Sequence, residues 1–245
     1  MSISTGLSPE AIAFVTAAQK DARKAFRVLR ETRTISASGT LSFTARIPGE
    51  QNLLVNLGYT GPWGDDLDEV ATSVVGFDGK NYWGKAAQLG EGRYTKLFVQ
   101  HPDVQAISHV HAPYLGAYAQ VHGTLPLLYV PNRRYRFTAE LPVYIDRRQS
   151  EVDFIIEAIN RDKEVPGIVE ANGGSTIWSK KGLLDLANTI LFLEEGAQFQ
   201  VLAAALGGSK AFGPGVLQQQ WRMGGLVPPT AVVDQDGTIR QAAAE

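Results

Sequence analysis

The chain has 245 residues, of which 44% are apolar and 20% charged, and it contains 25 glycines and 12 prolines. This length allows a large buried core, and one α/β domain accounts for the composition better than two small domains. The net charge of −2 gives no general basic field, which excludes nucleic acid and anionic membrane surfaces as expected partners and favours small molecules. Because cysteine is absent, any metal must be bound by histidine, carboxylate, amide or water, and the composition suits a cytoplasmic protein.

The first half of the sequence predicts a helix followed by strands. Residues 1–6 lack the basic start and apolar core of a secretory signal, and no apolar run approaches the roughly 18 residues of a membrane span. Ser8-Pro9-Glu10 precedes apolar residues at helical spacing up to Leu29, which predicts a long opening helix. Short β-rich segments separated by glycine then predict strands at 41–46, 53–56 and 73–77.

The second half alternates helix and strand patterns without a repeat or a long linker. The predicted elements are a short helix at 94–100, a strand at 104–111, a helix from Pro113 to about 121, a strand at 142–145, a helix at 150–161, a strand at 167–169 and a helix at 183–206. We therefore expect one domain over residues 1–245, with a core of about 10–208 and an extension over 209–245. The polar stretch from Gln235 is expected to be a loose tail.

The strand at 104–111 carries two histidines at alternate positions. Side chains alternate across a strand, so His109 and His111 point to one face, roughly 6.5–7 Å apart along the backbone, and can converge on one cation. The strand leads straight into a predicted helix, and such turns often bind ligands in α/β folds. Spacing alone leaves open that both histidines are structural or exposed.

Several motifs resemble the class II aldolase/adducin family. Pro102-Asp-Val-Gln-Ala-Ile-Ser-His-Val-His-Ala-Pro-Tyr114 is similar to its signature block, and Gly39-Thr-Leu-Ser-Phe-Thr-Ala-Arg46 is similar to its Gly-Asn-Ile-Ser element. Tyr59-Thr-Gly61 resembles its Thr-Gly turn, the segment 167–173 stands at its Asn-His-Gly motif, and Glu194-Glu195-Gly-Ala-Gln198 resembles its closing helix. The resemblance covers about residues 10–208.

The resemblance implies a fold, a cofactor and an assembly. The fold would be a three-layer α/β/α arrangement with a central, mostly antiparallel sheet. The cofactor would be a divalent ion, Zn²⁺ or Mn²⁺, bound by His109 and His111 in a homotetramer whose active sites lie between subunits. Glu91 stands near the family's catalytic acid, in a register that needs a one-residue deletion, and Tyr114 is a further catalytic candidate with a packing role as its alternative.

The third metal histidine of the family falls on Asn172. An amide oxygen is a much poorer ligand than imidazole for Zn²⁺, so the site is either remodelled or weaker. Glu170, on the same strand face, is the alternative third ligand, and a set of two histidines and one carboxylate would also suit Fe²⁺. The remaining alternative makes Asn172 a simple turn residue in a chain that has lost its metal, as in adducin.

The phosphate-binding part of the family pattern is also altered. The serines before the catalytic acid are replaced by Leu89-Gly90, and the asparagine of the glycine motif is replaced by Thr40, so a phosphorylated sugar is not expected. Backbone amides and hydroxyls could instead bind a substrate carboxylate, or these could be ordinary turn residues. The candidates are Ser38, Gly39, Thr40, Thr60 and Gly61.

A second group of residues stands outside this pattern. Arg133, Arg134 and Arg136 form a local basic cluster, which we expect to be solvated or to face another subunit. Binding of a substrate carboxylate is the alternative.

The sequence thus predicts a metal-dependent carbon–carbon lyase, a decarboxylase or an aldolase. Its substrate would be a non-phosphorylated, carboxylate-bearing small molecule, with an aromatic body as one option. Two alternatives stay open. One is a repurposed enzyme on the same fold, such as an Fe-dependent oxygenase, an isomerase or a cyclase. The other is an adducin-like interaction module without catalysis.

Overall fold

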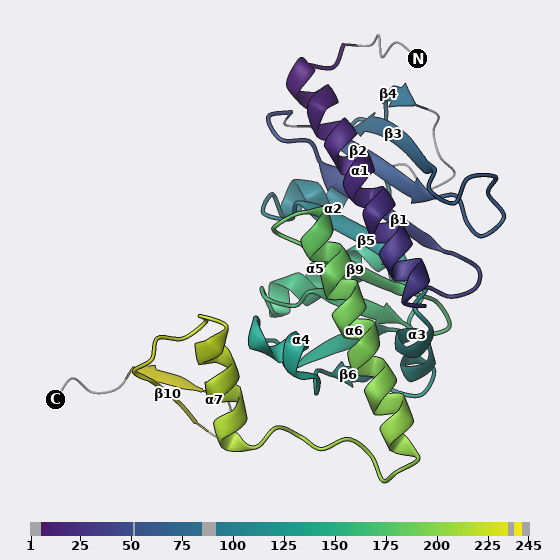
Figure 1. Ribbon diagram of the computed structural model, residues 1–245. Helices are drawn as coiled ribbons and strands as arrows, with labels where there is room; N and C mark the ends of the chain where they lie inside the picture. Colours follow the sequence, from purple (N-terminus) through teal and green to yellow (C-terminus); the bar gives the residue numbers. More distant parts are fainter. Residues whose placement is uncertain (1–5, 51, 85–91, 235–237, 242–245) are drawn as a thin grey trace.

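The structure, a computed structural model, describes residues 6–50, 52–84, 92–234 and 238–241. It consists of a large α/β domain and a small C-terminal unit. Helices lie on both sides of a central sheet, and the C-terminal unit sits beside one end of it (Figure 1). The helices of the domain are α1 (Pro9–Glu31), α2 (Thr95–Gln100), α3 (Pro113–Ala119), α4 (Val130–Arg134), α5 (Glu151–Arg161) and α6 (Leu183–Ala204). No helix of the described residues is long and apolar enough to cross a membrane.

Nine strands form the central sheet in the order β4-β3-β2-β1-β5-β9-β8-β7-β6. They are β1 (Leu41–Arg46), β2 (Leu53–Tyr59), β3 (Val70–Gly76), β4 (Asn81–Gly84), β5 (Ala106–Val110), β6 (Thr124–Pro126), β7 (Glu140–Tyr144), β8 (Gly167–Glu170) and β9 (Ser175–Ser179). Each pair of neighbours is antiparallel except β7 and β8, which run parallel. The predicted α/β fold with a mostly antiparallel sheet is therefore confirmed.

Local sequence signals explain the long helices. The Ser8 side chain accepts a hydrogen bond from the amide of Ala11, and Pro9 occupies the first turn of α1, where its missing N–H costs nothing. The buried face of α1 repeats at helical spacing from Ala11 to Leu29. By contrast, α6 is apolar on most of its circumference because the sheet, α1 and α3 all pack against it.

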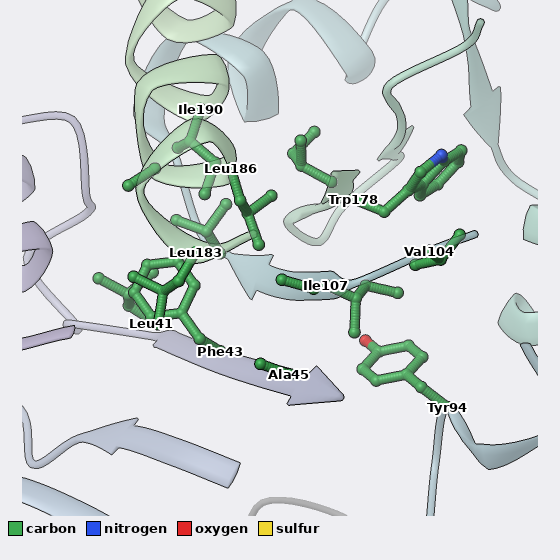
Figure 2. Close-up of a cluster of buried hydrophobic side chains, with 14 of the residues drawn as sticks. Leu41, Phe43, Ala45, Tyr94, Val104, Ile107, Trp178, Leu183, Leu186 and Ile190 are labelled. Atoms are coloured by element: carbon green, nitrogen blue, oxygen red, sulfur yellow. The ribbon is translucent and has the colours of Figure 1, made fainter. Parts of the chain in front are cut away.

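The two faces of the sheet differ in chemistry. Leu41, Phe43 and Ala45 of β1 alternate toward α6, where Figure 2 shows them near Leu183 and Leu186 in the hydrophobic core. The alternate residues of β1 face the opposite side. There the strand register places Ser42 of β1, His109 of β5 and Thr176 of β9 in one row across the sheet. The polar row belongs to the face that α5 covers.

The C-terminal extension contains more structure than the sequence analysis predicted. Helix α7 (Pro214–Met223) is followed by β10 (Ala231–Val233) and β11 (Ile239–Gln241), which pair antiparallel. The expectation of a loose tail from Gln235 is therefore wrong for residues 239–241. Short apolar segments of this kind carry too weak a periodicity to predict from sequence.

Helix α7 packs on α4 and on the basic residues at its end. Trp221 is 2% exposed, and its indole N–H lies 2.9 Å from the Arg133 carbonyl oxygen and 3.2 Å from that of Arg136. The Arg133 guanidinium is buried as well, where it donates to the carbonyl oxygen of Phe137 and lies over the Trp221 ring. The expectation of a solvated or subunit-facing cluster is thus wrong for Arg133, because its guanidinium is buried against a carbonyl oxygen and an indole ring of the same chain.

Replacing Trp221 with alanine should release the C-terminal unit without unfolding the large domain. The change removes a buried indole, so the free energy that holds residues 209–233 in place should fall by about 3–5 kcal/mol. Hydrogen exchange read by mass spectrometry measures this directly. Trp63, which is 95% exposed, provides the matched control, since Trp63→Ala should leave exchange unchanged. Equal exchange of residues 209–233 in both variants would show that Trp221 does not anchor the unit.

Candidate active site

His109 and His111 lie at the end of β5, in the middle of the sheet. The backbone is fixed on both sides of His111, whose amide donates to the Thr40 carbonyl oxygen at 3.0 Å and whose carbonyl accepts from the Ser36 amide at 2.7 Å. The two imidazole rings are 5.3 Å apart between centroids, at an interplanar angle of 71°. The side chains predicted to share one face therefore lie together at the start of the turn into α3.

One ring nitrogen of His109 is occupied by protein groups. Nδ1 lies 3.1 Å from the Thr176 hydroxyl oxygen and 3.2 Å from Oε1 of Glu170. The Thr176 hydroxyl has one proton, and its shortest contact, 2.5 Å, is to Oε1 of Glu151. With that proton directed to Glu151, Thr176 and the Glu170 carboxylate both act as acceptors for His109. This places the imidazole proton on Nδ1 and leaves Nε2 as a free lone-pair donor.

Two buried carboxylates meet at this threonine. Glu151 is 8% exposed and pairs with Arg93, while Glu170 is 3% exposed and lies 3.0 Å from Nη1 of Arg147. Burial alone would raise the pKa of Glu170, but the hydrogen bond and charge of His109, together with Arg147, outweigh it and lower the pKa to about 2. Glu170 is therefore an ionised acceptor at neutral pH.

These side chains offer two positions for a cation. Among the described residues, ligand atoms of His109, Glu151 and Glu170 lie within 4.8 Å of one another. However, the Thr176 hydroxyl already lies between these three groups, and Arg93 and Arg147 balance the two carboxylates. A divalent ion there would have to displace these contacts.

The second position, on the Nε2 side of His109, fits better. With a Zn–N bond of about 2.0–2.1 Å and tetrahedral angles, two imidazoles on one ion have ring centres about 5 Å apart, close to the observed separation. A histidine that binds metal through one nitrogen usually donates its other N–H to a carboxylate or similar acceptor. Glu170 and Thr176 supply that partner for His109, so the residues present fit a divalent ion shared by His109 and His111.

The turn between β8 and β9 carries the two candidates for a third ligand. Asn172 is exposed at its tip with a left-handed backbone (φ 56°), and Glu170 lies beneath it on β8. The turn packs closely on the histidines, because a Cβ at Gly174 would be 2.5 Å from Cδ2 of His111 and 2.4 Å from the Val110 carbonyl oxygen. Both candidates therefore belong to the same locality as the histidine pair, and Glu170 touches it directly.

The predicted substrate-binding loops lie against each other. A Cβ at Gly39 (φ 70°) would be 3.3 Å from the Cα of Gly61 (φ 87°), and the Ser38 hydroxyl is 2.9 Å from that of Ser36. The Thr60 hydroxyl is buried and has no hydrogen-bond partner among the described residues. Thr40 joins the loops to the histidines through its carbonyl bond with the His111 amide.

A cavity of about 380 Å³ adjoins these loops, between the end of α1 and the start of α3. Gly39, Tyr59 and Pro113 contribute to its wall, as do the side chains of Arg30 and Arg33. The loops and the cavity together form an anion-compatible surface beside the strand end that carries His111.

Of the two catalytic candidates, the structure describes Tyr114 but not Glu91. Glu91 lies outside the described residues. Tyr114 is partly buried and packs against the core, and its amide donates to Glu194 at 2.7 Å. Both roles stay predictions.

Sequence reasoning missed Glu151, Thr176 and the two arginines that balance the carboxylates. Glu151 follows Ser150, whose side chain caps α5, so it reads as an ordinary first-turn acid. Thr176 reaches His109 only through the pairing of β5 with β9, strands separated by more than 60 residues. No local pattern encodes that register, although the placement of Glu170 near the histidines was available from the family motif.

Removing the Thr176 hydroxyl should destabilise the protein and loosen His109. Thr176→Val keeps the shape but leaves the buried Glu151 oxygen short of a donor, so the free energy of unfolding should drop by about 1–3 kcal/mol. Imidazole ¹⁵N shifts of His109 should change, because Glu170 is then the one remaining acceptor for its Nδ1–H among the described residues. Ser175→Ala is the matched control, because that buried hydroxyl has no partner among the described residues. Equal unfolding energies and unchanged ¹⁵N shifts in both variants would contradict the bridging role.

Glu194 should make stability depend on pH. Burial raises its pKa to about 7 from 4.5, against the hydrogen bonds from the amides of Tyr114 and Leu115. Because the pKa is higher in the folded state, the stabilising contribution is complete below pH 4.5 and is lost as pH rises through 7. Urea unfolding between pH 5 and 8 should show a loss of about 2–3 kcal/mol in the wild type that is absent in Glu194→Gln. Glu157→Gln, at an exposed position of α5, should keep the wild-type slope, and the same slope in Glu194→Gln would refute the assignment.

Comparisons with known proteins agree with the fold. L-Fuculose 1-phosphate aldolase superposes with a TM-score of 0.67 at 16% identity, covering 84% of this chain and 95% of its own. The L-fuculose 1-phosphate aldolase from Glaciozyma antarctica PI12 gives 0.67 at 18% identity, with 90% and 86% covered. YgbL from Escherichia coli, described as a putative aldolase/epimerase/decarboxylase, gives 0.64 at 16%, with 84% and 98% covered. These identities are low, so the superpositions show the fold alone.

Sequence comparison places the chain more specifically. No curated protein sequence matches it. A family model described as the class II aldolase and adducin N-terminal domain matches residues 21–201, a span that includes the His109–His111 strand, the turn after β8 and most of α6. The chain therefore belongs to the class II aldolase and adducin family.

Proposed function

We propose that the protein is a metal-dependent carbon–carbon lyase, a decarboxylase or an aldolase, acting on a non-phosphorylated, carboxylate-bearing small molecule. The observation that carries the proposal is the state of His109. Thr176 and Glu170 occupy its Nδ1, which leaves Nε2 to bind a cation beside His111. An interaction module without catalysis would not need a histidine pair held in this way.

The metal supplies one kind of chemistry. A bound divalent ion stabilises the negative charge that develops on substrate oxygens when a carbon–carbon bond breaks. His109 and His111 would hold it, and Zn²⁺ or Mn²⁺ suits imidazole and oxygen ligands. Asn172, at the tip of the adjoining turn, is the proposed further oxygen ligand.

Glu170 is assigned to orienting His109 rather than to binding the ion. Its two carboxylate oxygens face His109 and Arg147, and both contacts are lost if the side chain turns to a metal. The same contacts disfavour an iron site of two histidines and one carboxylate, and with it the oxygenase alternative. The lyase proposal needs no such third carboxylate ligand.

The protein residues would handle the proton. Glu91 is the proposed acid or base, and Tyr114 is the second candidate beside the histidine pair. Arg93, two positions after Glu91 in the sequence, pairs with Glu151 and so connects this part of the chain to Thr176 and His109. Both reactions require one proton to be delivered to the carbon left by the broken bond, and aldol cleavage also requires a proton to be removed from the substrate hydroxyl.

The substrate class follows from the loops and the neighbouring cavity. Leu89 and Gly90 replace the serines, and Thr40 the asparagine, of the family's phosphate-binding pattern. Arg30 and Arg33 border the cavity next to Gly39, and guanidinium groups pair well with a carboxylate. A carboxylate-bearing substrate without phosphate accounts for both features.

We further propose a single domain over 1–245 and a cytoplasmic homotetramer with active sites at subunit boundaries. Support for assembly comes from the end of α6 and the turn after it, where Phe199 (52%), Leu202 (55%) and Leu206 (88%) are exposed in the isolated chain. Exposed apolar residues grouped in this way are typical of protein interfaces. The absence of cysteine supports the cytoplasmic assignment.

The first measurement is the metal content and activity of histidine variants. The wild type should bind close to one divalent ion per chain, whereas His109→Ala and His111→Ala should each weaken binding by more than about 100-fold, because each change removes a direct ligand. Turnover should fall together with metal binding in both variants. His122→Ala is the matched control, because this exposed histidine only stacks on Tyr118 and should leave metal binding unchanged.

The reaction is tested by following two products. Release of carbon dioxide from hydroxy-aromatic and keto acids would identify a decarboxylase, and release of an aldehyde from hydroxy-keto acids would identify an aldolase. Glu91→Gln should lower turnover by about 100-fold with the metal retained. Wild-type metal binding in both histidine variants would reject the site. Metal binding without either product would reject the lyase and leave the metal centre standing.

A further inference from the structure

A cavity of about 470 Å³ lies far along the sheet from the histidine pair. Its wall comes from the segment after α4, the loop before β8, the last residues of β9 and the first turns of α6. His109 pairs with Thr176 near the start of β9, whereas this cavity adjoins the other end of that strand, next to Ser179. The volume falls within the range of small-molecule sites.

Arg136 is a cation on this wall whose donors are largely unused. Its side chain is half-buried, and its guanidinium has one hydrogen bond among the described residues, a long contact of 3.4 Å from Nη1 to the Asn132 carbonyl oxygen. Among the described residues, no carboxylate forms an ion pair with Arg136. Burial lowers the pKa of Arg136, against the opposing charges of Asp185 and Glu164. A half-buried guanidinium without an ion pair favours an anion in the cavity beside it.

The neighbouring charges leave a positive surplus. Lys163, Lys180 and Lys181 line the cavity together with Arg136, against the two acids Glu164 and Asp185. Lys180 pairs with Asp103 at 3.1 Å, and Lys181 lies 4.0 Å from Asp185. Within the described part of the chain, the Lys163 ammonium has one hydrogen bond, to the neutral side chain of Asn160 at 3.0 Å. Two cations are thus available to a ligand, while the acids disfavour a highly charged one.

The remaining wall is apolar and partly aromatic. Trp178, which is 4% exposed, lines the cavity together with Pro131, Pro166 and Phe192. Rings and proline faces of this kind bind flat apolar groups by contact area. A bare inorganic ion would leave these surfaces uncovered.

We propose that this cavity binds a small organic anion, with a single acidic group at Arg136 and Lys163 and a flat apolar body against Trp178, Pro131 and Phe192. The acidic group is a carboxylate or a phosphate, because a guanidinium can donate two parallel hydrogen bonds to either group. The site is independent of the histidine pair and of the proposed lyase reaction.

Calorimetry with matched probes tests the site on the full-length protein. Benzoate should bind at least about 10-fold more tightly than acetate, which lacks the ring, and than benzyl alcohol, which lacks the charge. Phenyl phosphate against benzoate distinguishes a phosphate group from a carboxylate. The measurements are repeated in His109→Ala, so that binding at the proposed metal centre cannot account for the signal.

Variants locate the binding to the cavity. Arg136→Gln should weaken benzoate binding by about 10-fold or more, and Arg136→Lys should restore part of it. Lys163→Gln changes an exposed side chain that does not support the fold, so it tests the site even if Arg136→Gln is unstable. Arg161→Gln, a nearby exposed position outside the cavity, is the control and should bind as the wild type does. Equal affinity for benzoate and acetate, or unchanged affinity in both the Arg136→Gln and Lys163→Gln variants, would overturn the proposal.

Discussion

The hydroxyl of Thr176 joins two buried carboxylates to the imidazole of His109. It lies 2.5 Å from Glu151, 3.2 Å from Glu170 and 3.1 Å from Nδ1 of His109. Two carboxylates so close in the protein interior repel each other, and their desolvation is costly unless each has a compensating partner. Arg93 and Arg147 provide that compensation from outside the sheet. The orientation of His109, and through it the candidate metal centre, depends on this arrangement.

The change at the family's third histidine is easier to understand beside this network. Asn172 stands exposed at the tip of the turn, while Glu170 below it is drawn toward His109 and Arg147. The chain therefore has one fewer imidazole but a strong anionic partner for a remaining one, and such a partner raises the basicity of a metal-binding histidine. Such a site has one imidazole ligand fewer, but a remaining imidazole is made more basic by its carboxylate partner. This is consistent with a divalent ion held by two histidines and oxygen donors.

Local patterns in the sequence predicted what depends on neighbours along the chain. The cap at Ser8, the apolar spacing of α1 and α6, and the shared face of His109 and His111 all follow from short-range geometry. The pairing of His109 with Thr176 depends on a strand register set by packing across the whole sheet, and the approach of Glu151 depends on where α5 docks. Arg133 looked like a surface cation because nothing in its own segment signals that Trp221, 88 residues later, covers it.

The region around His109 and the region around Arg136 differ in how their charges are balanced, and this difference indicates a different role for each region. Around His109 each buried charge has a partner at hydrogen-bond distance within the chain, so the network is complete and can serve as rigid support for a metal ligand. Around Arg136 the guanidinium faces a cavity with one long contact to a carbonyl oxygen. A satisfied network orients its neighbours, whereas a half-buried cation without an ion pair favours an anion that can reach it. The charge left without a partner therefore points to a ligand at the second region, and the completed network points to support at the first.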